Sequence, residues 1–532
     1  MERALEAGQL DWAEEEQETE ESPYLLTTGA GIMSPTGTNL RVAGVDEPDH
    51  VKVVGDYIYD TAPTDVTEAG RIVWTTGVDL RIVKATPGSP PQTLADIEFP
   101  RPTGVRLGSN FEALIEDTVA IFFASHRYAS YLYEYDITDP ARPQFVKLLE
   151  VSGAHVRSVR LVAGKAVVIL ESHMMLPLRT GRGSPLYLAE RYPLYRVLDH
   201  TLQSVADGML VDCQGVHLPL SDRFPFNGTV VMSIDLNEGL TAQKSIMVLN
   251  RPRDIYVSGP SVYIGVHGRA GYELHRVSLR SDQHPRYAGS VRVDGRLDEW
   301  LMDEYDGRLR LYTLGNYGSG VANRLRVVRL GDWWADHSRK TVDDWEIAGV
   351  DVDGGGWRAA FFGDRVYIVQ PGRGLAQWKE YEFRESESPT WIRDFIVPGG
   401  AIHVQPLGDD GVLILGMAGD LYEGGRSVLV AHRRDSSGAV RSTQLELGSE
   451  RMPAVYEYRR MTIHNGVAWP LKFKGGGAVV LCGVEVTEDQ VTLGPRIFAG
   501  QEFLYLVPRD DRMLLVTRAE VSLLSEEWRY VE

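Results

Sequence analysis

The feature that most constrains the fold of this chain is a repeated unit of two short apolar strands joined by a tight turn. In each unit, alternating apolar and aromatic residues predict strands, and a Gly-Asp, Gly-Lys or similar pair predicts the turn between them. The units start typically about 40–60 residues apart, a spacing that is typical of propeller blades. Nine such units can be recognised, at residues 51–60, 113–125, 158–172, 254–266, 302–314, 359–370, 404–416, 461–473 and 504–517.

A four-stranded sheet that is apolar on both faces cannot cover both of them by itself. Sheets stacked radially bury each face against the next sheet and leave only short edges exposed. The sequence therefore predicts an all-β fold, a single β-propeller of about eight blades, with seven or nine as alternatives. We expect the short last unit to share a sheet with an N-terminal strand near residues 39–45, which would close the ring.

Two segments depart from the repeat. Residues 1–38 include six glutamates between Glu14 and Glu21, a run that repels itself and has no apolar face to bury. We interpret residues 1–38 as a flexible acidic leader, with a docking tail as the alternative, and residues 39–532 as the propeller. The second segment, residues 173–224, is a long insertion in the third repeat. Long loops are often functional, and the alternative is a flap packed on one face of the propeller.

Composition excludes several classes of protein. The formal net charge is −19, whereas binding to nucleic acid needs a basic face. No apolar run approaches the roughly 18–20 residues that span a bilayer, so no transmembrane segment is expected in this chain. The two cysteines, Cys213 and Cys482, exclude a disulfide framework and a four-cysteine zinc site.

The common signals of catalysis are missing from the sequence. There is no G-x-S-x-G nucleophile elbow, no phosphate-binding glycine loop and no H-E-x-x-H zinc helix. The glycine-rich segment at residues 351–356 has two aspartates at calcium-loop spacing, but its twelfth position is Phe362 instead of glutamate. We therefore expect a protein that binds a partner and has no catalytic activity. No cofactor is expected, and the alternative is a divalent cation such as calcium.

Polar residues recur where the innermost strand of each unit is expected to begin. The mouth of a propeller channel is concave and accepts convergent polar groups, so these residues are candidates for binding a ligand or an ion. Alternatively, they pair with one another and with trapped water, which would close the channel. A single metal site that includes all of the possible ligands is disfavoured, because the blades would spread them round a ring. The candidates are His50, Glu112, Asp254, Asp303, Glu304, Arg358 and His403.

Several segments resemble, in order, those of a known family. "TNLRVAGVDEPDHVKVVGDYIY" (38–59) resembles the opening of bacterial and archaeal secreted proteins that carry a C-terminal β-propeller domain distantly related to WD-40 repeats. "LDEWLMDEYDGRLRLYT" (297–313) resembles the family's most recognisable motif, and "FIVPGGAIHVQPLGDDGVLILG" (395–416) resembles a later segment. Where the family suggests a Ser-Arg pair, this chain has "VRSVR" (156–160). Within the second motif, we expect Asp303 or Glu304 to pair with an arginine or with backbone amides and to serve structure before function.

The resemblance implies a propeller outside the cytoplasm, often behind a signal or a lipoprotein anchor, and it implies no established reaction. The hypothesis is therefore an extracytoplasmic scaffold in the cell envelope or secreted, which binds a protein partner through the face that carries residues 173–224. The alternative is a metal-dependent or enzymatic propeller with its site at the channel mouth. The acidic leader would suit a tether to a membrane anchor that precedes Met1, and a native gene that starts at Met1 would favour the cytoplasm instead.

Overall fold

The fold was analysed in a computed structural model of the 532-residue chain. It describes residues 27–28, 42, 45–61, 67–68, 71–72, 78–86, 89–102, 105, 107, 111–126, 129–173, 192–218, 227–268, 271–279, 284–315, 323–330, 343–346, 358–370, 375–383, 389–398, 400–407, 411–418, 426–434, 440–446, 462–464, 467–475, 478–486, 491–500, 503–509, 512–517 and 521–523. Nearly all of these residues lie in strands or in the turns between them.

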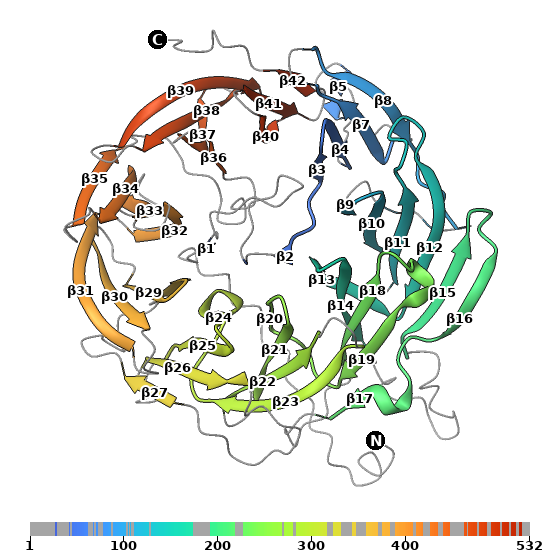
Figure 1. Ribbon diagram of the computed structural model, residues 1–532, viewed down its shortest axis with the longest axis horizontal. Coiled ribbons are helices and arrows are strands. Elements are labelled where there is room, and N and C mark those ends of the chain that lie inside the picture. The colour runs from blue at the N-terminus through green and yellow to red at the C-terminus, as the bar shows by residue number, and fades with distance from the viewer. Residues whose placement is uncertain are drawn as a thin grey trace.

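The strands form antiparallel sheets that follow one another round a ring in chain order (Figure 1). This arrangement is the predicted β-propeller. The first sheet contains β3 (Val51–Val54), β4 (Tyr57–Asp60), β7 (Leu80–Lys84) and β8 (Gln92–Ile97). The second contains β9 (Glu112–Glu116), β10 (Val119–His126), β11 (Ala129–Asp136), β12 (Gln144–Ser152), β15 (Leu194–Asp199) and β16 (Ser204–Met209). The third contains β2 (Val45–Asp46), β13 (Ala154–Val162), β14 (Lys165–His173), β18 (Asn227–Asp235), β19 (Lys244–Val248) and β17 (Val216–His217).

The next three sheets have four strands each. The fourth contains β20 (Asp254–Val257), β21 (Ser261–Gly268), β22 (Gly271–Ser278) and β23 (Arg286–Val293). The fifth contains β24 (Met302–Tyr305), β25 (Arg308–Thr313), β26 (Arg324–Arg329) and β27 (Asp343–Glu346). The sixth contains β28 (Arg358–Phe362), β29 (Arg365–Gln370), β30 (Leu375–Phe383) and β31 (Pro389–Pro398).

The last three sheets bring the chain back to the first. The seventh contains β1 (Thr27–Thr28), β32 (Gly400–Leu407), β33 (Gly411–Ala418), β34 (Arg426–Arg434) and β35 (Val440–Glu446). The eighth contains β36 (Thr462–His464), β37 (Val467–Gly475), β38 (Ala478–Val486) and β39 (Val491–Gly500). The ninth contains β40 (Phe503–Arg509), β41 (Arg512–Thr517) and β42 (Val521–Leu523). The remaining elements are the pair β5 (Thr67–Glu68) and β6 (Arg71–Ile72) and the 3-10 turns η2 (Cys213–Gly215), η3 (Leu240–Ala242) and η4 (Glu299–Leu301).

The number of blades stays a prediction, because the ninth sheet contains three described strands and the way in which it is completed decides the number. The expected N-terminal partner of that sheet was wrong for the described part of residues 39–45. Val42 bridges to Val45, and β2 pairs with Leu161 and Val162 of β13 in the third sheet. Of the predicted leader, Thr27 and Thr28 pair in parallel with β32, and its other residues lie outside the described residues.

The tight turns confirm the reading of the repeated unit. Gly55 and Gly363 have φ values of 53° and 56°. These values lie in the left-handed region of backbone conformation, which residues with a Cβ atom seldom adopt. Each glycine is followed by an aspartate, and each joins the two innermost strands of its sheet. The Gly-Asp pair therefore fixes a two-residue turn that directs the chain back along the sheet.

The hydrophobic core lies between neighbouring sheets. One cluster includes Leu149 and Val197 of the second sheet together with Val230 and Met232 of the third, and it contains further residues of both. Another includes residues of the fourth, fifth and sixth sheets, among them Tyr312. From the first sheet to the seventh, neighbouring sheets thus bury described side chains between them, which is the physical reason for the ring.

The insertion in the third repeat forms the outer edge of two sheets. The chain leaves the third sheet after β14 and adds β15 and β16 to the outer edge of the second sheet, where β15 pairs with β12. It returns through η2 to β17, which pairs in parallel with β19 at the outer edge of the third sheet. The described part of the insertion, residues 192–218, therefore joins two neighbouring sheets at the rim of the ring.

Candidate functional site

The acidic N-terminal segment around residues 45–50 is held by two cations from different sheets. Lys52 of β3 is 0% exposed, and its Nζ donates to Asp46 Oδ1 at 2.9 Å and to the carbonyl of Glu47. Arg160 Nη2 of β13 lies 3.2 Å from Glu47 Oε1. A buried carboxylate is costly without a partner, so these pairs explain why acidic residues occur at the inner edge of the sheets.

The same segment also contacts the second sheet. The amide and carbonyl of Asp49 pair with the backbone of Ala113 in β9. His50 Nδ1 lies 2.6 Å from the carbonyl of Phe111, which precedes β9. Residues 45–52 therefore connect the inner strands of the first three sheets, and we refer to this segment as the inner clasp. His50 and the acidic residues beside it have structural partners here.

The predicted pairing in the Asp-Glu-Tyr motif is confirmed. Arg310 is buried and donates from Nε to Asp303 Oδ2 at 2.9 Å, with a second bond from Nη2. Its guanidinium also lies over the rings of Tyr305 at 4.7 Å and of Phe361 and Phe383 at 5.3 Å. The fifth sheet is thereby fixed to the sixth through a desolvated arginine.

Glu304 contacts the fourth sheet, which is the neighbour of the fifth sheet on the other side. Its Oε2 accepts hydrogen bonds from Ser258 Oγ at 2.5 Å and from Tyr263 Oη at 2.7 Å. Its backbone amide donates to Tyr256 Oη at 3.0 Å. The motif thus joins the fourth, fifth and sixth sheets, and Asp303 and Glu304 both have structural partners.

The carboxyl group of Asp254 has a raised pKa. Asp254 begins β20, and its carboxylate accepts a hydrogen bond from Tyr272 Oη. The pKa of Asp254 is raised to about 7, chiefly by burial. The nearby charges of Asp298 and Glu299 add to the rise, and the hydrogen bond from Tyr272 and the charge of Arg253 oppose it. Gly265 faces Asp254 across the strand pair, and a Cβ at that position would lie 1.9 Å from Tyr272 Oη. The missing side chain of Gly265 therefore lets Tyr272 reach the carboxylate.

The remaining candidates lie on separate sheets. Glu112 begins β9 opposite Phe123, Arg358 begins β28 opposite Val369, and His403 lies in β32 opposite Leu415. The side chains of Arg358 and His403 lie outside the described residues. Among the residues whose side chains are described, no group of three or more His, Cys, Asp and Glu could hold a metal ion. The proposed ligand or ion site at the channel mouth stays a prediction.

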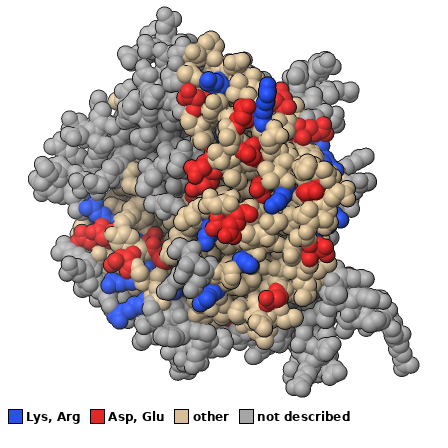
Figure 2. All heavy atoms as spheres, turned by 45° about the vertical axis from the view of Figure 1, so that its right-hand side comes forward, with Lys and Arg blue, Asp and Glu red and all other residues tan. Residues whose placement is uncertain are grey.

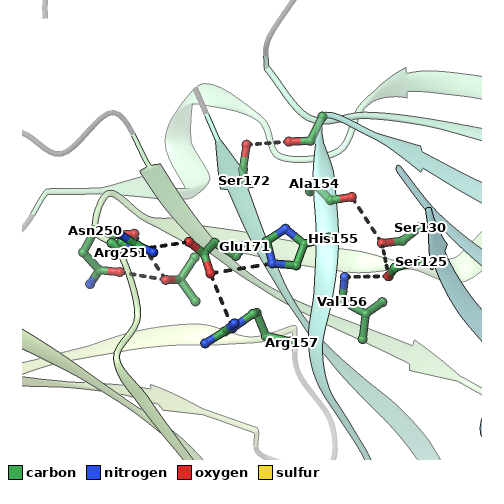
Figure 3. Close-up of polar contacts among 12 residues, drawn as sticks. Ser125, Ser130, Ala154, His155, Val156, Arg157, Glu171, Ser172, Asn250 and Arg251 are labelled. Carbon is green, nitrogen blue, oxygen red and sulfur yellow. Dashed lines mark hydrogen bonds and ion pairs between the residues drawn. The ribbon is translucent and has the colours of Figure 1, made fainter. Parts of the chain in front are cut away.

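A cluster that the sequence analysis did not single out gathers around Glu171 (Figure 3). The carboxylate lies between Arg157 and His155 on one side and Arg251 on the other. Glu171 Oε2 is 3.4 Å from Arg157 Nε and 3.7 Å from His155 Nε2, and Oε1 is 3.6 Å from Arg251 Nε. We call these four residues the arginine cluster. The "VRSVR" departure was its one signal in the sequence, because Arg157 belongs to that segment.

The arginine cluster lies at one end of a row of paired residues that runs across the strands of the third sheet. His155 pairs with Glu171, Glu171 with Thr229 and Thr229 with Val248. Val248 in turn pairs with His217, which the insertion supplies. The outer part of this row is therefore made by the insertion, and Arg251 follows the end of β19.

Three of the four exposed large apolar side chains in the described part of the insertion occur at the same ends of the strands, and the fourth, Val205, lies near the other end of β16. Leu194 pairs with Ser152, which lies two residues before the start of β13, and with Met209 of β16. Leu218 follows His217, whose carbonyl accepts a hydrogen bond from Leu249. These side chains are 39%, 55% and 54% exposed for Leu194, Met209 and Leu218. We call these three residues the apolar rim.

The face of the molecule that Figure 2 shows carries both signs of charge on its described residues. Figure 2 shows acidic side chains grouped near the middle of the visible face, with basic side chains distributed among them. No helix within the described residues is long and apolar enough to cross a membrane.

Comparison with known proteins agrees with the ring of sheets. The model of a family described as "Beta propeller domain" matches residues 35–369. The chain belongs to the beta propeller domain family. No curated protein matches the propeller sequence.

Two solved structures match part of the chain. The WD40 domain of Toxoplasma gondii coronin is 11% identical, with 63% of this chain and 80% of that chain covered and a TM-score of 0.25. Apo AztD from Citrobacter koseri is 11% identical, with 61% of this chain and 86% of that chain covered and a TM-score of 0.32. At such identities and scores, neither structure bears on what this propeller binds.

Proposed function

We propose that this propeller is an extracytoplasmic scaffold that binds a protein partner and catalyses no reaction. The observation that carries the proposal is the apolar rim, three large hydrophobic side chains of the insertion that are 39–55% exposed. Exposed apolar residues that gather on one part of a surface are typical of interaction sites, and singly scattered ones are not.

The backbone at the rim supports the same proposal. β16 is the last strand of the six-stranded second sheet within the described residues. An edge strand offers backbone N–H and C=O groups to an extended segment of a partner, while side chains beside it supply specificity. The rim would thus combine β-strand addition along β16 with burial of Leu194 and Met209.

A binding experiment tests this proposal. Tagged protein would be cross-linked in its native cells, and the recovered partner would be purified and titrated against variants of the propeller. Met209→Gln/Leu218→Gln should weaken binding at least tenfold, because a partner would no longer bury two large apolar side chains at about 1.5–3 kcal/mol each. Trp391→Gln/Ile396→Gln is the matched control, since these side chains of β31 are 56% and 65% exposed on the sixth sheet. An equal loss in both variants would contradict a specific role of the rim.

The location outside the cytoplasm is supported by the resemblance of residues 38–59 and 297–313 to secreted propeller proteins. Fractionation of native cells with an antibody against the propeller tests it. Recovery in the cytoplasmic fraction, together with a native gene that starts at Met1, would refute the extracytoplasmic role. The binding role would still be tested by the titration of the purified partner against variants of the propeller.

A second function, a propeller that uses an ion or a proton at its channel mouth, has one observation in its favour. Asp254 has a pKa of about 7, and a carboxyl group with such a pKa suits proton transfer near neutral pH. A thermal-shift titration with Ca²⁺ tests the version with a divalent cation. A rise in Tm that Asp254→Asn abolishes would favour this function over a purely protein-binding one.

A further inference from the structure

We propose that the arginine cluster binds an acidic peptide segment of the partner, through paired contacts of carboxylates with Arg157 and Arg251. This inference deepens the proposed function and rests on it. It adds a charged site of defined chemistry to the apolar rim, and it predicts which kind of sequence the partner presents.

The charges of the cluster do not balance. Glu171 is a single carboxylate, 2% exposed, and it faces two guanidinium groups and an imidazole. Two arginines carry two positive charges at all relevant pH values, so at least one positive charge is left at the surface. The net charge of the whole chain is −19, so a local excess of positive charge is opposite in sign to the overall charge of the protein.

The geometry leaves the binding side of each guanidinium open. Arg157 and Arg251 are 44% and 65% exposed, and both approach Glu171 through Nε. Within the described residues, neither guanidinium has a hydrogen bond or ion pair with any other residue. The Nη groups can therefore meet a carboxylate from outside, and the planar fork of a guanidinium matches the two oxygens of a carboxylate.

Glu171 gives the site a fixed shape. The buried carboxylate of Glu171 on β14 lies between the two arginines and contacts the Nε of each, so less side-chain freedom is lost when a ligand binds to their Nη groups. The role of Glu171 is thus to position the arginines, and the arginines contact the ligand.

The neighbours of the cluster favour a peptide as the occupant. The apolar rim lies at the same strand ends, since Leu194 pairs with Ser152 just before β13 and Leu218 follows the strand that pairs with β19. A peptide with acidic and apolar side chains satisfies both surfaces, whereas a free inorganic anion would use only the arginines. Charge complementarity and adjacent apolar surface are the usual composition of a protein interface.

Fluorescence anisotropy with a labelled hexaglutamate peptide tests the proposal on the full chain. We expect saturable binding that weakens as salt is raised, with no binding of a labelled hexaglutamine peptide. Arg157→Gln/Arg251→Gln should weaken hexaglutamate binding at least tenfold. Arg157→Lys/Arg251→Lys keeps both charges but not the fork, and it should give an intermediate loss.

A matched control removes two charges elsewhere. Arg142 and Arg286 are exposed. Arg142 lies in the turn after β11, and Arg286 begins β23 opposite Ser278, so both lie at the ends of their sheets opposite to the cluster. Arg142→Gln/Arg286→Gln should change hexaglutamate binding by less than twofold. Because loss of both cluster arginines leaves Glu171 buried without them, the triple variant that adds Glu171→Gln is measured as well. The triple variant should also fail to bind, with a circular dichroism spectrum like that of the native protein.

The outcomes separate this inference from the proposed function. Unchanged hexaglutamate binding in the double or the triple variant would overturn it, as would inorganic phosphate that binds more tightly than hexaglutamate and displaces it. If hexaglutamate binding fails while the rim variants still abolish partner binding, the acidic-peptide site is refuted and the scaffold function stands. If hexaglutamate binds as expected but the rim variants have no effect, the rim is refuted and the cluster stands.

Discussion

Replacing Asp254 by asparagine should change how the stability of the propeller depends on pH. The carboxyl group is partly buried at the start of β20, and the hydroxyl of Tyr272 donates to it. Burial raises its pKa from 3.8 to about 7 in the folded protein. Asparagine has nearly the same shape, can still accept the hydrogen bond from Tyr272, and cannot ionise.

The sign and size of the effect follow from proton linkage. In the unfolded chain an aspartate has a pKa of about 3.9. Below that pH both states hold the proton and the contribution of Asp254 to stability is fully present. Between about pH 4 and pH 7 the folded state holds a proton that the unfolded state has lost, so the free energy of unfolding decreases as the pH rises. At about 1.4 kcal/mol per pH unit, the full loss is on the order of 4 kcal/mol.

Urea unfolding at several pH values between 4 and 8 measures this effect. The Asp254→Asn variant should match the native protein near pH 4 and exceed it by up to about 4 kcal/mol at pH 8. Asp207→Asn is the control, because Asp207 is exposed on β16. A difference between Asp254→Asn and the native protein that stays constant from pH 4 to pH 8 would refute the reasoning, as would an asparagine variant that is less stable at pH 8.

Three further predictions concern buried contacts. Lys52→Met leaves Asp46 buried without its 2.9 Å partner, so the free energy of unfolding should fall by about 3–5 kcal/mol in urea titrations, and an unchanged value would show that the inner clasp is dispensable. Gly265→Ala places a Cβ 1.9 Å from Tyr272 Oη, so we expect a loss of about 1–3 kcal/mol, and a native Tm would contradict the close approach. Asp303→Ala leaves a buried arginine unpaired and should also cost about 3–5 kcal/mol; unchanged stability together with lost partner binding would mean that the motif serves function first.

The contacts within the candidate sites were harder to predict from the sequence than the strands were. The acidic residues near His50 were visible in the sequence, but the cations that hold them come from β3 and β13, and no local pattern relates Glu47 to Arg160. The prediction that Asp303 or Glu304 pairs with an arginine or with backbone amides was within reach of the sequence, because Arg310 lies opposite Asp303 on the next strand of the hairpin. The arginine cluster escaped prediction because His155 and Arg157 meet Arg251 only when the third sheet is assembled.

The sequence by itself determined the local features of this protein: the strands, the Gly-Asp turns at Gly55 and Gly363, and the need to stack sheets in a ring. These features depend on neighbours in the chain, on backbone sterics and on the alternation of apolar side chains, all of which can be read along the chain. Tertiary structure alone decided that the N-terminal segment pairs with β13 and that strands of the third repeat extend the second sheet. Edge strands can pair with any strand that offers free backbone groups, so the choice is made by burial and charge between segments that are distant in sequence.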